Sequence, residues 1–221
     1  MILLDTKSIR IHGLTVSPYK TNCFIVETQE GSFIIDPAGD GKAIAEYLWL
    51  QKISVQFLIA THYHFDHVSA AHTLQKFGIG ETLYLHPDER PNIKQANTYS
   101  LLLEKRAFKK PQSITLIDEN FENHLKKMGF LMKHLPGHTP GHIILYTRDE
   151  KFLFPGDLII NNLLNISLTL FTEDKKKLRH SILQILDLFL DTTVIFPGHG
   201  RPSLMEVERH YNSKINIICG E

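Results

Sequence analysis

The stretch THYHFDH, residues 61–67, places three histidines and one aspartate within seven positions. It follows the apolar run 57–60, which predicts a buried strand over residues 55–61 that delivers these side chains at its carboxyl end. A lone histidine is usually a solvated or core side chain, but four coordinating groups directly after a buried strand are not explained in this way. Imidazole and carboxylate are ligands for zinc, manganese or iron. The stretch therefore predicts a metal site.

The spacing within this stretch indicates how the ligands divide. In an extended chain, residues two apart point to the same side, so His62, His64 and Asp66 are expected to face one way. His67 is then expected to point elsewhere, where it can serve a second ion.

Three later turns share one pattern, a glycine directly before a coordinating side chain. They are LPGHTPGH at 135–142, FPGD at 154–157 and FPGHG at 196–200. Glycine permits the tight turn that holds the next side chain against a site. Each turn alone is common, but together with the first stretch they indicate one constellation. The candidates that they add are His138, Asp157 and His199.

Strands and helices are expected to alternate twice along the chain, which indicates an α/β fold with two sheets packed face to face and helices outside. The expected strands cover residues 8–17, 22–28, 31–36, 55–61, 83–86, 114–117, 130–135, 142–147, 152–154 and 194–196. The expected helices cover residues 42–48, 66–77, 173–190 and 203–212. Residues 87–112, which contain three prolines, are expected to form a loop with a short helix.

The composition restricts the partners and the compartment. Lys+Arg and Asp+Glu both number 24, and nucleic-acid binders usually carry a basic excess, so no nucleic-acid partner is expected. Two cysteines suit a reducing cytosol rather than a disulfide framework. We recognise no signal peptide and no bilayer-spanning run, so we expect a cytoplasmic protein without a membrane partner. The oligomeric state stays open.

The motifs THYHFDH, LPGHTPGH, FPGD and FPGHG, in this order, resemble those of the metallo-β-lactamase fold superfamily. The first stretch matches the superfamily signature H-x-H-x-D-H, and the resemblance extends from Asn22 and Asp36 to His199. It implies a single domain over residues 1–221, folded as a four-layer αββα sandwich of two mixed β-sheets with helices outside. It also implies a site for two divalent metal ions, zinc in first place, with iron and manganese open.

The resemblance assigns a role to each candidate ligand. The first ion would be held by His62, His64 and His138. The second ion would be held by Asp66, His67 and His199. Asp157 would bridge both ions. Asp36 matches an early aspartate of the superfamily that usually supports a ligand instead of binding metal.

Within the superfamily, the chain looks most like the glyoxalase II type, which hydrolyses hydroxyacylglutathione thioesters. Lactam hydrolases of this fold generally lack the bridging aspartate, and RNA-processing members are typically longer. Two departures argue against glutathione as the substrate. Only 22 residues follow His199, too few for the helical domain of full-length glyoxalases II, and residues 158–171 lack the Gly-Arg-x-Asp stretch of many close relatives.

The implied activity is hydrolysis of a small-molecule thioester or lactone by a hydroxide that two metal ions share. Asp66 would orient this hydroxide or pass its proton to the leaving group. We recognise no dedicated acid, which favours a thiolate or lactone leaving group over an amine. Two alternatives remain: a mononuclear-iron persulfide dioxygenase of the same fold, which needs only His62, His138 and Asp157, and a non-catalytic metal-binding protein.

The apolar segment 158–171 follows the expected bridging ligand directly. If its side chains face the site, they form a wall for an apolar acyl group, as ligand pockets are mostly apolar. A buried strand or helix explains the segment equally well. The first interpretation predicts a preference for hydrophobic acyl thioesters or lactones over lactoylglutathione.

Overall fold

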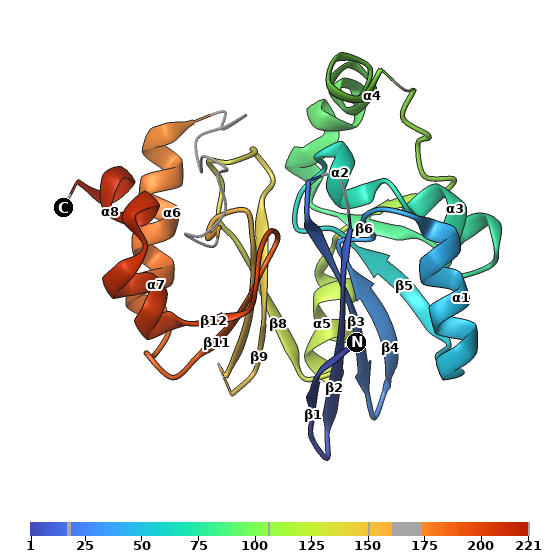
Figure 1. Cartoon of the computed structure of the whole chain (residues 1–221), viewed down its shortest axis with the longest axis horizontal. Coiled ribbons are helices and arrows are strands. Elements are labelled where there is room, and N and C mark those ends of the chain that lie inside the picture. The colour runs from blue at the N-terminus through green and yellow to red at the C-terminus, as the bar shows by residue number, and fades with distance from the viewer. Residues whose placement is uncertain (17–18, 106, 150, 161–173, 221) are drawn as a thin grey trace. The chain divides into compact units, whose positions relative to one another are not determined.

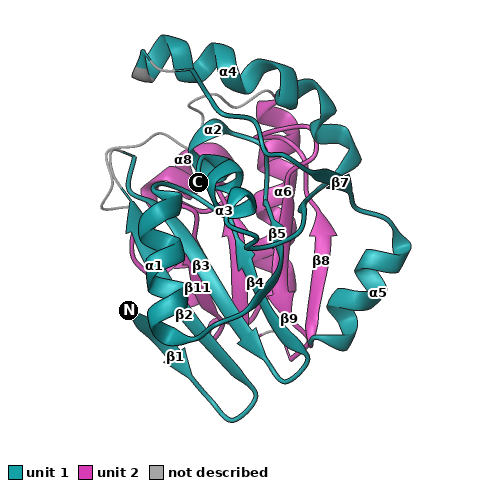
Figure 2. Cartoon of the chain, turned by 90° about the vertical axis from the view of Figure 1, so that its right-hand side faces the viewer, with its two compact units in different colours: residues 1–128 teal, residues 129–221 magenta. Residues whose placement is uncertain are grey.

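The computed structural model describes residues 1–16, 19–105, 107–149, 151–160 and 174–220. The chain divides into two compact units, unit 1 (Met1–Met128) and unit 2 (Gly129–Glu221), which Figure 2 distinguishes by colour. Each unit contains one mixed β-sheet with helices packed on it (Figure 1). The prediction of a single domain over residues 1–221 stays a prediction.

Unit 1 is built on a seven-stranded sheet whose strands stand in sequence order, β1 to β7. The strands are β1 (Ile2–Asp5), β2 (Ile9–Val16), β3 (Thr21–Thr28), β4 (Gly31–Ile35), β5 (Val55–Ile59), β6 (Leu83–Leu85) and β7 (Ile114–Leu116). Antiparallel pairing joins β1 to β4, and parallel pairing joins β4 to β7. The expected strands of this unit are confirmed, and the short edge strand β1 is an addition.

Helices pack on both faces of this sheet. The helices α1 (Gly41–Gln51) and α3 (Ala71–Lys76) lie along one face (Figure 1). The residues Ile44 and Leu48 of α1 share a buried cluster with Leu58 of β5. Successive strand residues point to opposite faces, so Phe57 points away from this cluster, and its ring contacts Phe121 of α5 (Glu119–Lys127). The helix α5 therefore packs on the opposite face.

The segment 87–112 corrects the sequence prediction. It contains a 3-10 turn, η1 (Pro87–Glu89), and a 15-residue helix, α4 (Arg90–Glu104), where a loop with a short helix was expected. The prolines explain the difference. Pro87 begins η1 and Pro91 lies in the first turn of α4, where a helix needs no backbone N–H and the fixed φ of proline is favourable.

The expected helix over residues 66–77 is also divided in two. The helix α2 (Phe65–Val68) ends before Ala70, whose N–H donates to the carbonyl of Pro37 (2.9 Å) instead of to a carbonyl within a helix. The hydroxyl of Ser69 accepts a hydrogen bond from Gly39 N (2.7 Å). These contacts hold the chain against the loop after β4, and α3 then begins at Ala71.

Unit 2 is built on a five-stranded sheet in the order β12-β11-β10-β9-β8, in which only β10 and β11 are parallel among the described pairs. The strands are β8 (Phe130–His134), β9 (Ile143–Thr147), β10 (Phe152–Gly156), β11 (Val194–Pro197) and β12 (Ser203–Leu204). The helices α6 (Lys175–Leu188), α7 (Met205–Tyr211) and α8 (Ser213–Cys219) cover one face of this sheet (Figure 1).

The helix expected over residues 173–190 is confirmed as α6, with the predicted inward residues Leu178, Ile182 and Ile185 buried. The helix α8 was not expected. Its first turn is capped by Asn212, whose side chain accepts hydrogen bonds from the N–H groups of Lys214 and Ile215.

The apolar segment 158–171 is described only as far as Ile160. Leu158, Ile159 and Ile160 are buried in the core of unit 2 together with α6, so these three residues support the core and form no wall of a site. Residues 161–171 lie outside the described part of the chain.

Among the described residues, no helix combines the length and the apolar character that crossing a bilayer requires.

Candidate metal centre

The loop that carries the THYHFDH stretch begins at the carboxyl end of β5, inside the parallel part of the sheet of unit 1. Thr61, His62 and His67 are buried, and His64 is partly exposed. The expected alternation of side chains holds for His62 and His64 but ends at Phe65, where α2 begins. Asp66 therefore does not continue the extended pattern, because a helical residue follows a different period.

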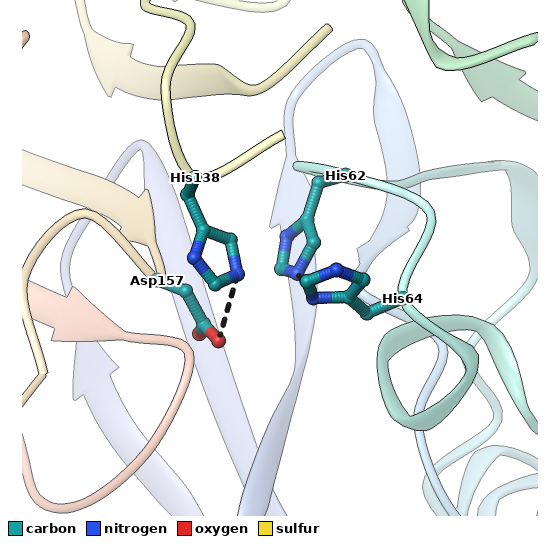
Figure 3. Close-up of side chains that lie close together, drawn as sticks. All are labelled: His62, His64, His138 and Asp157. Carbon is teal, nitrogen blue, oxygen red and sulfur yellow. Dashed lines mark hydrogen bonds and ion pairs between the residues drawn. The ribbon is translucent and has the colours of Figure 1, made fainter. Parts of the chain in front are cut away.

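His62 and His64 present their imidazoles to each other, as Figure 3 shows. His62 Nε2 lies 3.0 Å from His64 Nδ1, and the ring centroids are 4.6 Å apart. Two nitrogens bound to one tetrahedral zinc ion lie roughly 3.3 Å apart, because each bond is about 2.0–2.1 Å long. The pair therefore has the spacing of two ligands of one ion.

Asp36 fixes the orientation of two candidate ligands. Its carboxylate accepts hydrogen bonds from Thr61 N (2.7 Å), Thr61 Oγ1 (2.9 Å) and His67 Nδ1 (3.0 Å). Since the Thr61 hydroxyl donates to Asp36, it accepts from Nδ1 of His62, 3.0 Å away. Both imidazoles then carry hydrogen on Nδ1, and their Nε2 atoms keep the lone pair that a metal needs. This agrees with the supporting role that the sequence resemblance implies for Asp36.

Asp66 and His67 form the second half of the ligand set in unit 1. Asp66 Oδ2 lies 3.7 Å from His67 Nε2 and accepts a hydrogen bond from the buried hydroxyl of Thr21 (2.9 Å). Thr21 begins β3, so the oxygen of Asp66 is fixed by a residue far away in sequence. The sequence pattern gave no signal for this contact.

In unit 2, one carboxylate oxygen lies beside two imidazoles. Asp157 Oδ2 is 3.5 Å from His138 Nε2 and 3.4 Å from His199 Nε2. All three residues are buried, with 5% of Asp157 exposed. Each of the three directly follows the glycine of one of the turns identified in the sequence. Figure 3 shows Asp157 directed at the ring of His138. A single carboxylate oxygen close to two imidazole nitrogens is suited to bridging two cations.

Two further histidines of unit 2 hold the backbone near these candidate ligands. His142 is fully buried, and its Nε2 accepts a hydrogen bond from the N–H of Asp157 (3.2 Å). His134 Nε2 donates to the carbonyl of Pro140 (2.8 Å) and so closes the turn that presents His138. Both residues thus support the site by fixing the backbone next to Asp157 and His138.

The donor set fits a transition metal. The seven candidates offer imidazole nitrogen and carboxylate oxygen and no sulfur, which suits zinc, iron or manganese better than calcium or magnesium. Both cysteines are buried, and burial raises the pKa of the Cys23 thiol to about 12, so Cys23 supplies no thiolate near neutral pH. The distances between neighbouring donors within each unit, 3.0–3.7 Å, match the ligand spacing around one ion.

The sequence matches the Metallo-beta-lactamase superfamily over residues 16–199, and the chain therefore belongs to this superfamily. The chain is 28% identical over 220 residues to the hydroxyacylglutathione hydrolase GloC of Haemophilus influenzae, a match that covers 94% of this chain and 99% of the relative. It is 26% identical over 207 residues to the probable metallo-hydrolase YqgX of Bacillus subtilis, covering 92% of this chain and 96% of that protein.

A solved structure described as TTHA1623 in a di-iron-bound form superimposes with a TM-score of 0.79 and 29% identity, over 91% of this chain and 98% of that chain. The predicted fold class is thus confirmed, as an α/β sandwich fold with two mixed sheets and helices.

Proposed function

We propose that the chain is a binuclear metal-dependent hydrolase that cleaves small-molecule thioesters. One ion would be held by His62, His64 and His138. The other would be held by Asp66, His67 and His199. Asp157 would contact both. The observation that carries this proposal is the position of Asp157 Oδ2, within 3.5 Å of one histidine from each set.

The bound metal ions and the protein side chains would have different roles in the reaction. When bound, two divalent ions acidify a water molecule and polarise the carbonyl of a substrate. Asp66 would orient the attacking water, because its Oδ2 accepts the Thr21 hydroxyl, which fixes the position of the carboxylate. Zinc suits this donor set, and the di-iron form of TTHA1623 supports iron as the first alternative.

The leaving group and the relatives support a thioester as the substrate class. A thiolate leaves without protonation, whereas an amine needs an acid, and the proposed ligand set contains no residue dedicated to that role. GloC, a hydroxyacylglutathione hydrolase, is matched over 99% of its length, so the short stretch after His199 is no argument against glutathione. The expected preference for apolar acyl groups is not supported by Leu158, Ile159 and Ile160, which are core residues.

The purified, metal-loaded protein is therefore expected to hydrolyse S-lactoylglutathione. Its kcat/KM on this thioester should exceed that on a β-lactam by on the order of a hundredfold, the contribution of a missing general acid. The same assay on a medium-chain acyl thioester and a lactone defines the preferred acyl group, and a metal-stripped sample serves as the control. Equal rates on the β-lactam, or no thioester hydrolysis at all, would contradict the proposal.

A further inference from the structure

Glu89 is a fully buried carboxylate outside the proposed ligand set. It stands at the junction of η1 and α4 in unit 1. Its Oε2 accepts two hydrogen bonds, from the backbone N–H of Tyr63 and from the side-chain amide of Asn92, each of 3.0 Å. A buried acid without such donors would be strongly unfavourable, so these contacts are needed to keep it in place.

The backbone group that Glu89 binds lies between two proposed metal ligands. Tyr63 separates His62 from His64, and its side chain is fully buried, with its ring in edge contact with Phe108 at 6.0 Å. Neighbours in an extended segment point to opposite sides, so burying the Tyr63 ring directs both imidazoles the other way. Glu89 fixes the same residue through its N–H.

Asn92 and α4 make this attachment rigid. Asn92 is buried in the first turn of the helix and donates to the oxygen that Tyr63 contacts, which sets the direction of the carboxylate. Ala96, one further turn along, is buried in the core cluster that also contains Tyr63. The position of Glu89 is therefore tied to the packing of the first half of this helix.

The two buried acids hold the loop at different points. Asp36 contacts Thr61 and His67, the residues before and after the histidine pair. Glu89 instead holds Tyr63, the residue inside the pair. Without Glu89, the backbone between His62 and His64 would lose the hydrogen bond that fixes the Tyr63 N–H. The 3.0 Å separation of His62 Nε2 and His64 Nδ1 would then be less well defined.

We propose that Glu89 is a positioning residue that sets the geometry of the His62–His64 pair for metal binding. The inference rests on the proposed function only in that this pair binds metal. It assigns Glu89 no contact with the substrate. What matters is that the side chain reaches the Tyr63 N–H, so an uncharged acceptor of the same length should replace it.

Four variants test this inference through metal affinity, by chelator competition, and through the absorption spectrum of the Co²⁺-loaded protein. Glu89→Ala is expected to lower the metal affinity of the site that contains His62 and His64 by about ten- to a hundredfold. It should also change the Co²⁺ spectrum. Glu89→Asp, which is one methylene too short, should resemble it. Glu89→Gln, which keeps the length and an acceptor oxygen, should restore the parental affinity and spectrum. Ala96→Gly, which destabilises the same helix, is the control.

The outcomes separate positioning from general stability. If Ala96→Gly weakens metal binding as much as Glu89→Ala does at an equal loss of thermal stability, the inference is overturned. It is also overturned if Glu89→Asp binds like the parent, a comparison that remains available if Glu89→Ala does not fold. A parent that binds two Co²⁺ ions but hydrolyses no thioester removes the proposed function and leaves this inference standing, whereas a parent that binds no metal removes both.

Discussion

Replacing Asp157 with alanine is expected to lower the kcat for thioester hydrolysis by on the order of a thousandfold, the range that removal of one charge-stabilising group at a reacting centre reaches. Its Oδ2 lies beside both His138 and His199. The variant would therefore lose a ligand of both proposed ions. His199→Ala removes a ligand of one ion only and should retain more activity.

The comparison requires that both variants remain folded. Thermal unfolding of the metal-free proteins supplies this control, and metal content after loading shows how many ions each variant retains. Asp157→Ala should lose more metal and more activity than His199→Ala. A variant without Asp157 that keeps nearly the parental rate would show that this carboxylate does not bridge.

The second large effect is expected from Gly137→Ala, in the turn that presents His138. Gly137 has a φ of 139°, which alone costs a residue with a Cβ about 1–3 kcal/mol. An added Cβ would also lie 2.1 Å from the backbone nitrogen of Leu178 and 2.4 Å from its Cα, so α6 would have to move. We expect a loss of more than about 3 kcal/mol in the free energy of unfolding, together with weaker metal binding through displacement of His138.

Gly129→Ala provides the matched control, because Gly129 also has a positive φ (85°) but an added Cβ would meet nothing within 4 Å. It should cost only the conformational penalty of about 1–2 kcal/mol. Urea unfolding measures both variants. If both alanine variants lose the same free energy of unfolding, the close approach of Leu178 to the turn that carries His138 does not constrain the site.

The fold could be predicted from sequence wherever the apolar pattern was dense. The strand of residues 55–61 and the helix over 173–190 were both found, because each buries a regular set of apolar side chains. The helix α5 was missed because it buries only two residues, Phe121 and Leu125, which gives a weak apolar pattern. The helix α4 was missed because its prolines, which usually interrupt helices, lie where the start of a helix tolerates them. Edge strands of two to four residues carry too little pattern to be recognised.

The candidate ligands could be proposed from sequence because each follows a strand in a short motif. Their supporting residues could not. The contacts of Thr21 with Asp66 and of Glu89 with Tyr63 join residues 45 and 26 positions apart, and neither residue belongs to a motif. Such contacts depend on how the elements pack, which a local pattern does not specify.

The central claim, a binuclear site, is tested most directly by the metal content of the purified chain. Elemental analysis after loading with zinc, iron or manganese and removal of excess metal is expected to give about two ions per chain. This measurement also separates the alternatives. A dioxygenase of the persulfide type would hold one iron ion per chain, and a scaffold protein would not require any metal. One ion per chain after loading with every metal, with a second ion bound under none of these conditions, would contradict the binuclear account.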